Sequence, residues 1–155
     1  MVYLSGQIMT QRSFQVAKAF IYQDDRLLLQ LRDNKPTIYH PNHWGLFGGS
    51  VDPGETPHQA IVRELMEELC WTPPEPRFLF TWDEEVKPWV TYIFALPLTV
   101  SVEQLCLTEG QALGLFTLSE LTHLQLVPKI QQMLPRVIEL LNQPDLTAAY
   151  RAITS

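Results

Sequence analysis

Basic residues are scarce in this sequence of 155 residues. It contains 11 Lys and Arg against 17 Asp and Glu, which gives a formal net charge of −6. A protein that binds nucleic acid needs clustered positive charge to neutralise phosphates. The composition therefore argues against nucleic acid as a partner, and an anionic substrate would need a cation to bridge it to the protein.

Cysteine is also rare, since only Cys70 and Cys106 are present. They form no C-x-x-C pair, so no disulfide framework is indicated. Two isolated cysteines in a chain of this kind are most often small buried side chains in a reducing compartment. We therefore expect both to be buried and reduced, with a disulfide as the minority alternative.

Long apolar runs and linkers are missing as well. No run approaches the length of a membrane span, and Met1 to Phe14 lacks the basic start and apolar core of a signal peptide. A hydrophobic content of 46% is enough for one substantial core. We expect a single domain over residues 1–155 that is cytoplasmic and makes no membrane contact, with a loosely held tail from about Gln143.

Glutamates recur at helical spacing in the run from Arg63 to Leu69. Glu64, Glu67 and Glu68 lie at i, i+3 and i+4 and share one face of a helix. The opposite face is apolar and carries Ile61, Val62, Leu65, Met66 and Leu69. Like charges at this spacing cost about 0.2 to 0.5 kcal/mol per pair. Because no compensating group is visible, we infer a divalent cation, and clustered carboxylates suit Mg²⁺ or Mn²⁺.

The residues before this helix favour a site over the alternative, a solvated acidic face. Thr56, Pro57 and Gln59 form the pattern of a capped helix start. Two glycines at 48 and 49, followed by Pro53-Gly54, predict a tight loop whose backbone approaches a ligand closely. Glu55 lies eight residues before Arg63, and we expect the folded loop to pair this carboxylate with the guanidinium.

Seven residues fall at the spacing G-x5-E-x7-R-E-U-x-E-E, in which U is an apolar residue. They are Gly49, Glu55, Arg63, Glu64, Leu65, Glu67 and Glu68. With this motif, which spans Gly49 to Trp71, the sequence resembles the Nudix hydrolases of the MutT-like kind. One position departs from the family, which usually has Gly where this chain has Cys70. The departure puts the left-handed exit from the helix in question.

The resemblance implies a role for each motif residue. The metal ligands would be the carbonyl of Gly48 and the side chains of Glu64, Glu67 and Glu68. Glu64 would also help to activate water, while Arg63 and Glu55 would orient the set. MutT-like members carry a further metal-binding Glu in an E-G-Q segment, and Glu109-Gly110-Gln111 is similar. An ordinary polar turn is the alternative reading of that segment.

Substrate-binding residues are less clearly marked. We assign Trp44, Phe47 and Gly49 to this role, and Trp82, Trp89 and Tyr92 are further candidates for stacking on a base. Large aromatic residues near strands are more often part of the core. His40 and His43 would either touch phosphates or lie exposed in a loop. Leu126 stands where MutT-like members have the Asn that reads oxidised guanine, which weakens that particular substrate.

Hydrophobic alternation and turn residues give a coarse map of the chain. We expect strands over 14–22, 27–31, 44–47, 77–82, 89–96 and 112–116. Helices are expected after Thr56, after Thr117, and from about Pro128, the last of them kinked or interrupted by Pro135. The family resemblance implies the α/β class, with a mixed β-sheet in an α/β/α sandwich.

The function that follows is a metal-dependent enzyme. We expect Mg²⁺-dependent hydrolysis of the pyrophosphate linkage in a nucleoside diphosphate derivative, with a (deoxy)nucleoside triphosphate as the preferred substrate class. An ADP-ribose or nucleotide-sugar pyrophosphatase is the runner-up. A Nudix-like regulator that binds a nucleotide without cleaving it is the second class of function. The small-molecule nucleotide is the expected partner, and a homodimer stays open.

Overall fold

The computed structural model describes residues 14–83 and 88–144. Predictions about the N-terminal segment before Phe14 lie outside these residues. The tail predicted to be loosely held begins inside them, where the carbonyl of Gln143 accepts a hydrogen bond of 3.3 Å from Arg77. From residue 145 onward, the tail lies outside the described part of the chain.

The fold is built on a mixed seven-stranded sheet in which β1 (Phe14–Gln23) is central. β1 runs parallel to β6 (Trp89–Pro97) over its whole length, from Phe14 opposite Trp89 to Tyr22 opposite Pro97. On its other edge it pairs antiparallel with β4 (Phe47–Ser50) in its first half and with β2 (Arg26–Leu31) at its end. The remaining strands, all antiparallel to their neighbours, are β3 (Trp44–Gly45) and β7 (Ala112–Thr117) on β2, and β5 (Arg77–Asp83) on β6.

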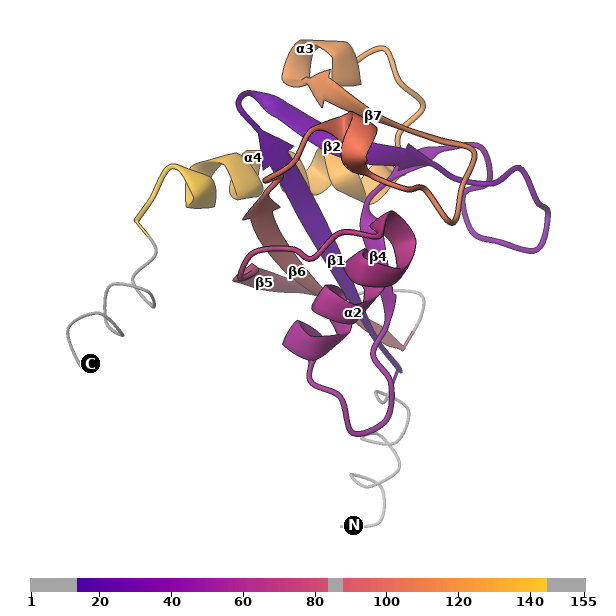
Figure 1. Ribbon diagram of the computed structural model, residues 1–155, viewed down its shortest axis with the longest axis vertical. Coiled ribbons are helices and arrows are strands. Elements are labelled where there is room, and N and C mark those ends of the chain that lie inside the picture. Colours follow the sequence, from indigo (N-terminus) through magenta and orange to yellow (C-terminus); the bar gives the residue numbers. More distant parts are fainter. Residues whose placement is uncertain (1–13, 84–87, 145–155) are drawn as a thin grey trace.

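Two long helices cover opposite faces of this sheet, α2 (Pro57–Leu69) in front of β1 and α4 (Pro128–Leu141) behind it (Figure 1). Each helix has its own apolar cluster. Ile61, Leu65 and Leu69 of α2 pack on Ala17, Ala19 and Ile21 of β1. On the other face, α4 packs Ile130, Met133 and Val137 against residues that include Phe20 and Ile93. The predicted α/β/α sandwich with a mixed sheet is confirmed.

The predicted helix starts are confirmed in detail. Thr56 caps α2 by accepting a hydrogen bond of 3.1 Å from the N–H of Gln59, whose side chain accepts one of 2.9 Å from the N–H of Thr56. Thr117 and Glu120 repeat the arrangement at α3 (Leu118–Leu121). Each box satisfies N–H groups that would otherwise lack a partner at a helix start. The remaining helical segment is a 3₁₀ turn, η1 (Val102–Gln104).

Pro135 does not interrupt α4, which continues to Leu141. A proline inside a helix removes one main-chain hydrogen bond. Here its ring lies on the exposed side of the helix, where water can satisfy the carbonyl that is left without a donor. Met133 and Val137, one on each side of the proline, are buried in the core and hold both halves of the helix on the sheet.

Three further expectations differ from the structure. The strand expected over 44–47 is divided into β3 and β4, because Leu46 between them turns into the core. Met66 is 47% exposed rather than packed, since the sheet covers only the side of α2 that bears Ile61 and Leu65. Cys70 and Cys106 are exposed instead of buried, because one ends α2 and the other lies in the loop beside that end.

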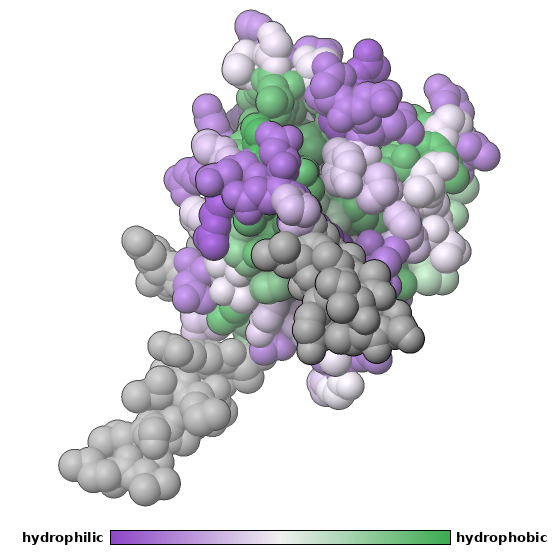
Figure 2. Space-filling model, turned by 90° about the vertical axis from the view of Figure 1, so that its left-hand side faces the viewer, coloured by the Kyte–Doolittle hydropathy of each residue, from purple (hydrophilic) through white to green (hydrophobic). Residues whose placement is uncertain are grey.

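Hydrophilic side chains spread over much of the face turned to the viewer in Figure 2, with apolar residues visible between them. None of the helices in the described ranges has the length and apolar character needed to cross a membrane.

Candidate active site

Two glycines within β4 let this strand lie close against β1 and α2. Gly48 has φ of +131°, and a Cβ there would collide with the carbonyl oxygen of Ala17. At Gly49 a Cβ would lie 2.6 Å from a carboxylate oxygen of Glu64. A side chain at either position would therefore push strand or helix away. Because Gly49 has no side chain, the Glu64 carboxylate can lie directly against the backbone of β4.

Arg63 is the centre of an ion-pair cluster on the exposed side of α2. Its Nε and Nη2 donate to the two carboxylate oxygens of Glu55 at 2.8 and 3.0 Å, a bidentate pair. Nη1 donates to Glu64 at 3.1 Å and to Glu67 at 3.3 Å. Nη2 also reaches the carbonyl of Ser50 at 3.0 Å. The predicted contact between Glu55 and Arg63 is present, and it fixes the loop to the helix.

These hydrogen bonds change the acidity of both partners. The guanidinium of Arg63, helped by the N–H of Asp52, lowers the pKa of Glu55 to about 2. The same contact raises the pKa of Arg63 above its usual value. Both groups are charged throughout the physiological pH range, so the cluster acts as a permanent clamp on α2.

Glu68 points from α2 into the interior of the protein. Its side chain is 4% exposed and accepts a hydrogen bond of 3.3 Å from the N–H of Gly48. Lys18, from the middle of β1, donates to the carbonyl of Gly48 at 3.0 Å and attracts Glu68. Burial raises the pKa of Glu68 to about 8, against the attraction of Lys18. Burial lowers the pKa of Lys18, which Glu68 opposes.

The three motif carboxylates share a helix stripe, as expected, but their ends diverge. Glu64 and Glu67 turn to Arg63, whereas Glu68 turns inward toward Lys18. Within residues 14–83 and 88–144, no three His, Cys, Asp or Glu side chains converge as a set of metal ligands. Arg63 and Lys18 also offset the charge that the sequence left without a visible counterpart. The electrostatic argument for a metal is therefore weaker than the sequence suggests.

The donor chemistry at the inner end nevertheless fits a hard cation. The Gly48 carbonyl is directed at a positive charge, the ammonium of Lys18, and the Glu68 carboxylate is held next to that carbonyl by the N–H of the same glycine. Oxygen donors of these two kinds are the ligands that Mg²⁺ and Mn²⁺ take in proteins. Glu68 and Glu109 line one small cavity of about 130 Å³, together with Lys18 and Arg32.

The turn that carries Glu109 is held in place by its neighbours. The N–H of Thr108 donates to the carbonyl of Glu68 at 3.0 Å, and the N–H of Gln111 donates to that of Leu31 at 2.8 Å. Between them Gly110 adopts φ of +90° close to Gln30. The structure thus brings Glu109 to the cavity of Glu68, 41 positions earlier in the chain.

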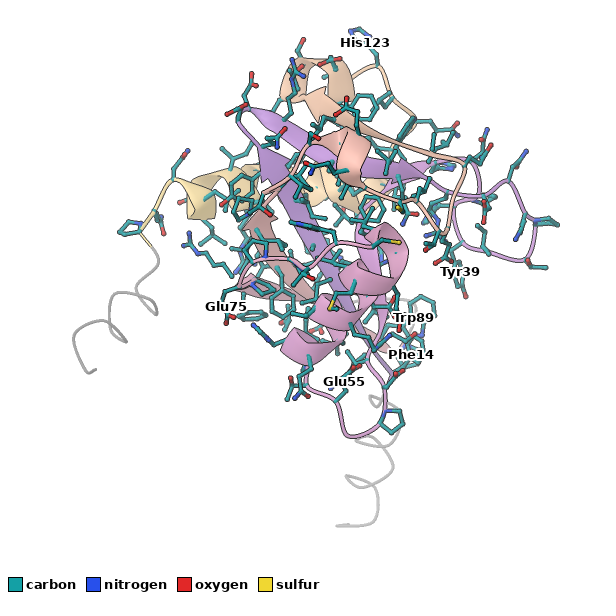
Figure 3. All side chains as sticks on the ribbon, in the orientation of Figure 1. Phe14, Tyr39, Glu55, Glu75, Trp89 and His123 are labelled. Carbon is teal, nitrogen blue, oxygen red and sulfur yellow. The ribbon has the colours of Figure 1, made fainter. Side chains whose placement is uncertain are left out.

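A second cavity, of about 270 Å³, opens on the face of the sheet that α4 covers. Its outer part is aromatic: the ring of Trp89 lies 5.1 Å from that of Phe14 and 5.2 Å from that of Tyr39. Figure 3 shows these three side chains gathered on one side of the molecule. The charged residues that line it are Lys18, Arg32 and Lys129, with no Asp or Glu among the described lining residues. It is an aromatic and cationic cavity in an acidic protein.

The predicted substrate residues divide between this cavity and the core. Gly49 lines the cavity, as do Trp89 and His40. Phe47 is fully buried beneath α2, and Trp44 packs edge-on against Phe116 at 4.8 Å. Trp44 and Phe47 are thus placed as core residues, because β3 and β4 turn their rings away from the cavity.

Sequence reasoning missed five residues of this cavity. They are Phe14, Lys18, Arg32, Tyr39 and Lys129. Only Lys18 carried a usable signal, since a lysine in the middle of the otherwise apolar run of β1 has no structural reason to be there. The other four come from three segments far apart in the sequence, because Arg32 and Tyr39 share one loop.

Cys70 settles the question of the helix exit. It has φ of +53° and ψ of +37°, the left-handed conformation that a glycine would adopt more easily, and its N–H donates to the carbonyl of Met66 at 3.0 Å. The chain leaves α2 in the left-handed way despite the Cβ, at a steric cost of about 1 to 2 kcal/mol.

The model of the NUDIX domain matches residues 13–137 of this chain. The chain belongs to the NUDIX domain family. The predicted family is confirmed, and with it the class of enzyme, a Nudix hydrolase.

The chain is similar to individual members of this family. A MutT NUDIX hydrolase from Burkholderia pseudomallei is 27% identical over 68% of this chain and 84% of that one, with a TM-score of 0.59. The NUDIX domain of Shewanella oneidensis NrtR, solved with ADP ribose, is 22% identical over 83% and 87% of the two chains, with a TM-score of 0.65, and shows the shared fold.

A curated relative, the nucleoside triphosphatase NudI of Salmonella arizonae, is 44% identical over 43 residues. These residues make up 28% of this chain and 29% of the relative. The match therefore spans less than a third of either protein.

Proposed function

We propose that this protein hydrolyses the pyrophosphate linkage of a nucleoside diphosphate derivative in a Mg²⁺-dependent reaction, with a (deoxy)nucleoside triphosphate as substrate. One observation carries the proposal. Lys18 and Arg32 line both the aromatic cavity that contains Trp89 and the small cavity that contains Glu68 and Glu109. A ligand with a base at one end and phosphates at the other spans this junction, with its anionic linkage against the two cationic side chains.

The nucleoside end belongs in the aromatic cavity. Trp89, Tyr39 and Phe14 offer faces and edges on which a base can stack. Lys129 adds a hydrogen-bond donor from the first turn of α4. Ammonium groups donate and cannot accept hydrogen bonds, so the cavity favours bases that present carbonyl oxygens over bases that present amino groups.

The phosphate end belongs at the carboxylates. The residues that would hold Mg²⁺ are Glu68 and the Gly48 carbonyl, joined by Glu64, Glu67 and Glu109. When bound, Mg²⁺ polarises a phosphoryl oxygen and lowers the pKa of a bound water.

Glu64 is the base in this scheme, because its carboxylate lies on Gly49, and Gly49 lines the substrate cavity. It accepts the proton of the attacking water. Arg63, clamped by Glu55, orients this carboxylate through a hydrogen bond of 3.1 Å. Water attacks one phosphorus in line, the bridging P–O bond breaks, and the leaving phosphate departs with the electron pair while Lys18 and Arg32 offset its charge.

A separate observation bears on each of the two alternatives, in favour of the first and against the second. The NrtR domain solved with ADP ribose supports an ADP-ribose or nucleotide-sugar pyrophosphatase. A regulator that binds a nucleotide without cleaving it is disfavoured, because the full set of Glu64, Glu67 and Glu68 is kept together with its Arg63 clamp. The triphosphate is favoured because NudI is a nucleoside triphosphatase, and because a cationic junction suits a chain of several phosphates.

A substrate screen tests these possibilities. The purified protein is incubated with three groups of substrates, each in the presence of Mg²⁺ or Mn²⁺. The groups are nucleoside triphosphates, ADP-ribose and nucleotide sugars.

 Each reaction is run with inorganic pyrophosphatase or alkaline phosphatase added, so that released pyrophosphate and phosphate-bearing products are both detected, and EDTA serves as the metal-free control. Turnover of triphosphates to a monophosphate and pyrophosphate supports the proposal. Turnover of ADP-ribose alone supports the alternative, and no turnover of any compound by a protein that still binds nucleotides supports the regulator.

A further inference from the structure

The end of α2 and the loop before Glu109 are joined by main-chain hydrogen bonds. The N–H of Cys106 donates to the carbonyl of Leu69 at 3.0 Å, and the N–H of Thr108 donates to that of Glu68 at 3.0 Å. The hydroxyl of Thr108 reaches the carbonyl of Glu67 at 2.8 Å. The loop thus satisfies carbonyls at the helix end that have no partner within the helix.

This contact places the two cysteines of the chain beside each other. Cys70 follows directly on Leu69, whose carbonyl is bonded to the N–H of Cys106. Both residues are exposed and neither is in a disulfide. Partial burial raises the pKa of Cys70, and a hydrogen bond with the neighbouring Cys106 thiol raises it further. The main-chain hydrogen bond to Leu69 thus places the two cysteines on adjoining segments, although 35 residues separate them in the sequence.

We infer that Cys70 and Cys106 are a site of reversible oxidation, at which a peroxide converts the two thiols to a disulfide between α2 and the Glu109 loop. The backbone brings the two residues close, because the N–H of Cys106 donates to the carbonyl of the peptide that joins Leu69 to Cys70. A disulfide needs Cα atoms roughly 4.4 to 6.8 Å apart. Exposure gives the oxidant access to both sulfur atoms.

The reaction balances with hydrogen peroxide as the oxidant. One thiolate attacks a peroxide oxygen, so that an S–O bond forms, the O–O bond breaks, and water leaves after proton transfer. The second thiolate then attacks the sulfenic sulfur, forming the S–S bond and releasing a second water. Two thiols lose two electrons in total, and one peroxide is reduced to two waters.

The disulfide would make a hydrogen-bonded contact covalent. It would tie the helix that carries Glu64, Glu67 and Glu68 to the loop that carries Glu109, the residue directly after Thr108. Closing a loop of this length removes conformational freedom mainly from the unfolded chain. The oxidised protein is therefore expected to melt about 5 °C or more above the reduced protein.

Intact mass spectrometry of the full chain tests the inference. The reduced protein is treated with hydrogen peroxide, then alkylated, and digested for peptide mapping. The expected product is lighter by two hydrogens, resists alkylation, joins the Cys70 and Cys106 peptides, has the higher Tm, and returns to the starting mass with dithiothreitol. Because the chain has only 2 cysteines, no other internal pairing competes.

Cys70→Ser and Cys106→Ser are the matched controls, since each keeps the volume at its position and removes one partner. Both are expected to fold with the Tm of the reduced protein and to gain oxygen or form adducts without the internal link. The inference is overturned if the wild-type protein keeps two alkylatable thiols, oxidises each cysteine separately, or forms only intermolecular dimers. None of these readouts depends on hydrolysis, so they are independent of the proposed function.

Discussion

The two faces of the sheet carry different halves of the site, and they are built differently. On the α2 face the functional groups come from one short stretch, residues 48–68, and are clamped by Arg63 through four acceptor residues. On the α4 face the cavity is assembled from β1, the loop after β2, β6 and α4. The groups proposed for the reaction are thus mostly local in the sequence, with Lys18 and Glu109 added from elsewhere. The groups proposed for recognition depend on the topology of the whole domain.

The largest expected effect comes from the α2 face. Glu68→Gln removes a charge at the predicted metal position and keeps the volume and an acceptor for the Gly48 N–H. We expect turnover with Mg²⁺ to fall about a thousandfold, because metal stabilisation of phosphoryl transfer is worth several kcal/mol. Circular dichroism should show an intact fold. Glu103→Gln, in the exposed turn η1, is the control and should keep full turnover; equal rates for the two variants would contradict the role of Glu68.

Lys18 joins the two faces, so its removal should affect stability as well as activity. Lys18→Met leaves Glu68 buried beside the Gly48 carbonyl without its cation, and we expect a loss of about 3 kcal/mol in the free energy of unfolding. Adding Glu68→Gln should recover part of this loss, because the unpaired buried carboxyl is removed. Urea unfolding of the two single variants and the double variant measures the coupling. Strictly additive effects would mean that the two side chains do not interact.

The α4 face is probed by Trp89→Ala. Stacking of a base on an aromatic side chain is worth about 1 to 3 kcal/mol. We therefore expect KM for the nucleotide to rise about tenfold with little change in kcat. Phe78→Ala is the comparison: it removes a more exposed ring, which packs on Phe94 instead of lining the cavity. If both variants raise KM equally, the aromatic cavity is not the nucleoside site.

A smaller gain is expected at the end of α2. Cys70→Gly removes the Cβ that opposes the left-handed conformation, and it should stabilise the reduced protein by about 1 kcal/mol. The measurement is the midpoint of urea unfolding at constant m-value. Cys106→Gly is a suitable comparison, because it removes the neighbouring side chain at a residue that is not in the left-handed conformation. A Cys70→Gly variant no more stable than wild type would show that the exit carries no strain.

The pH dependence of the Arg63 clamp is the smallest effect. The ion pair between Glu55 and Arg63 lies near the surface, with side chains 15% and 28% exposed, so solvent screens it. Its pKa is depressed in the folded protein, to about 2 from about 4.5. The folded state therefore binds fewer protons than the unfolded state over this interval. The stability that Glu55 contributes is complete above pH 4.5 and is lost as the pH falls toward 2. The stability difference between wild type and Glu55→Gln should shrink over that window, and a constant difference would refute the assignment.

The difference between the faces also explains what the sequence could reveal. The spacing of Glu55, Arg63 and Glu64 is set by one loop and one helix, so their contact could be predicted without knowing the fold. Strands and helix starts followed from alternation and from the Thr56 capping box for the same reason. Local rules are sufficient wherever the interacting residues share one element or its neighbour.

The aromatic cavity could not be predicted in this way. Phe14 meets Trp89 because β1 and β6 pair in parallel with these two residues opposite each other, a register that no local pattern encodes. Trp44 and Phe47 are candidates for stacking on a base because they are aromatic, whereas in the structure both rings pack with the two core clusters. The inward turn of Glu68 required knowledge that Lys18 lies across from Gly48 in the β1 and β4 pairing.

Lys18 and Arg32 line both the aromatic cavity and the small cavity that contains Glu68 and Glu109. With the substrate placed as proposed, substitutions at these two positions would alter the choice of nucleoside and the handling of phosphate together. Trp89 and Lys129 border the nucleoside side alone. Substrate range can therefore diverge through these outer positions while the hydrolytic machinery stays unchanged, which makes them the natural starting points for redesign.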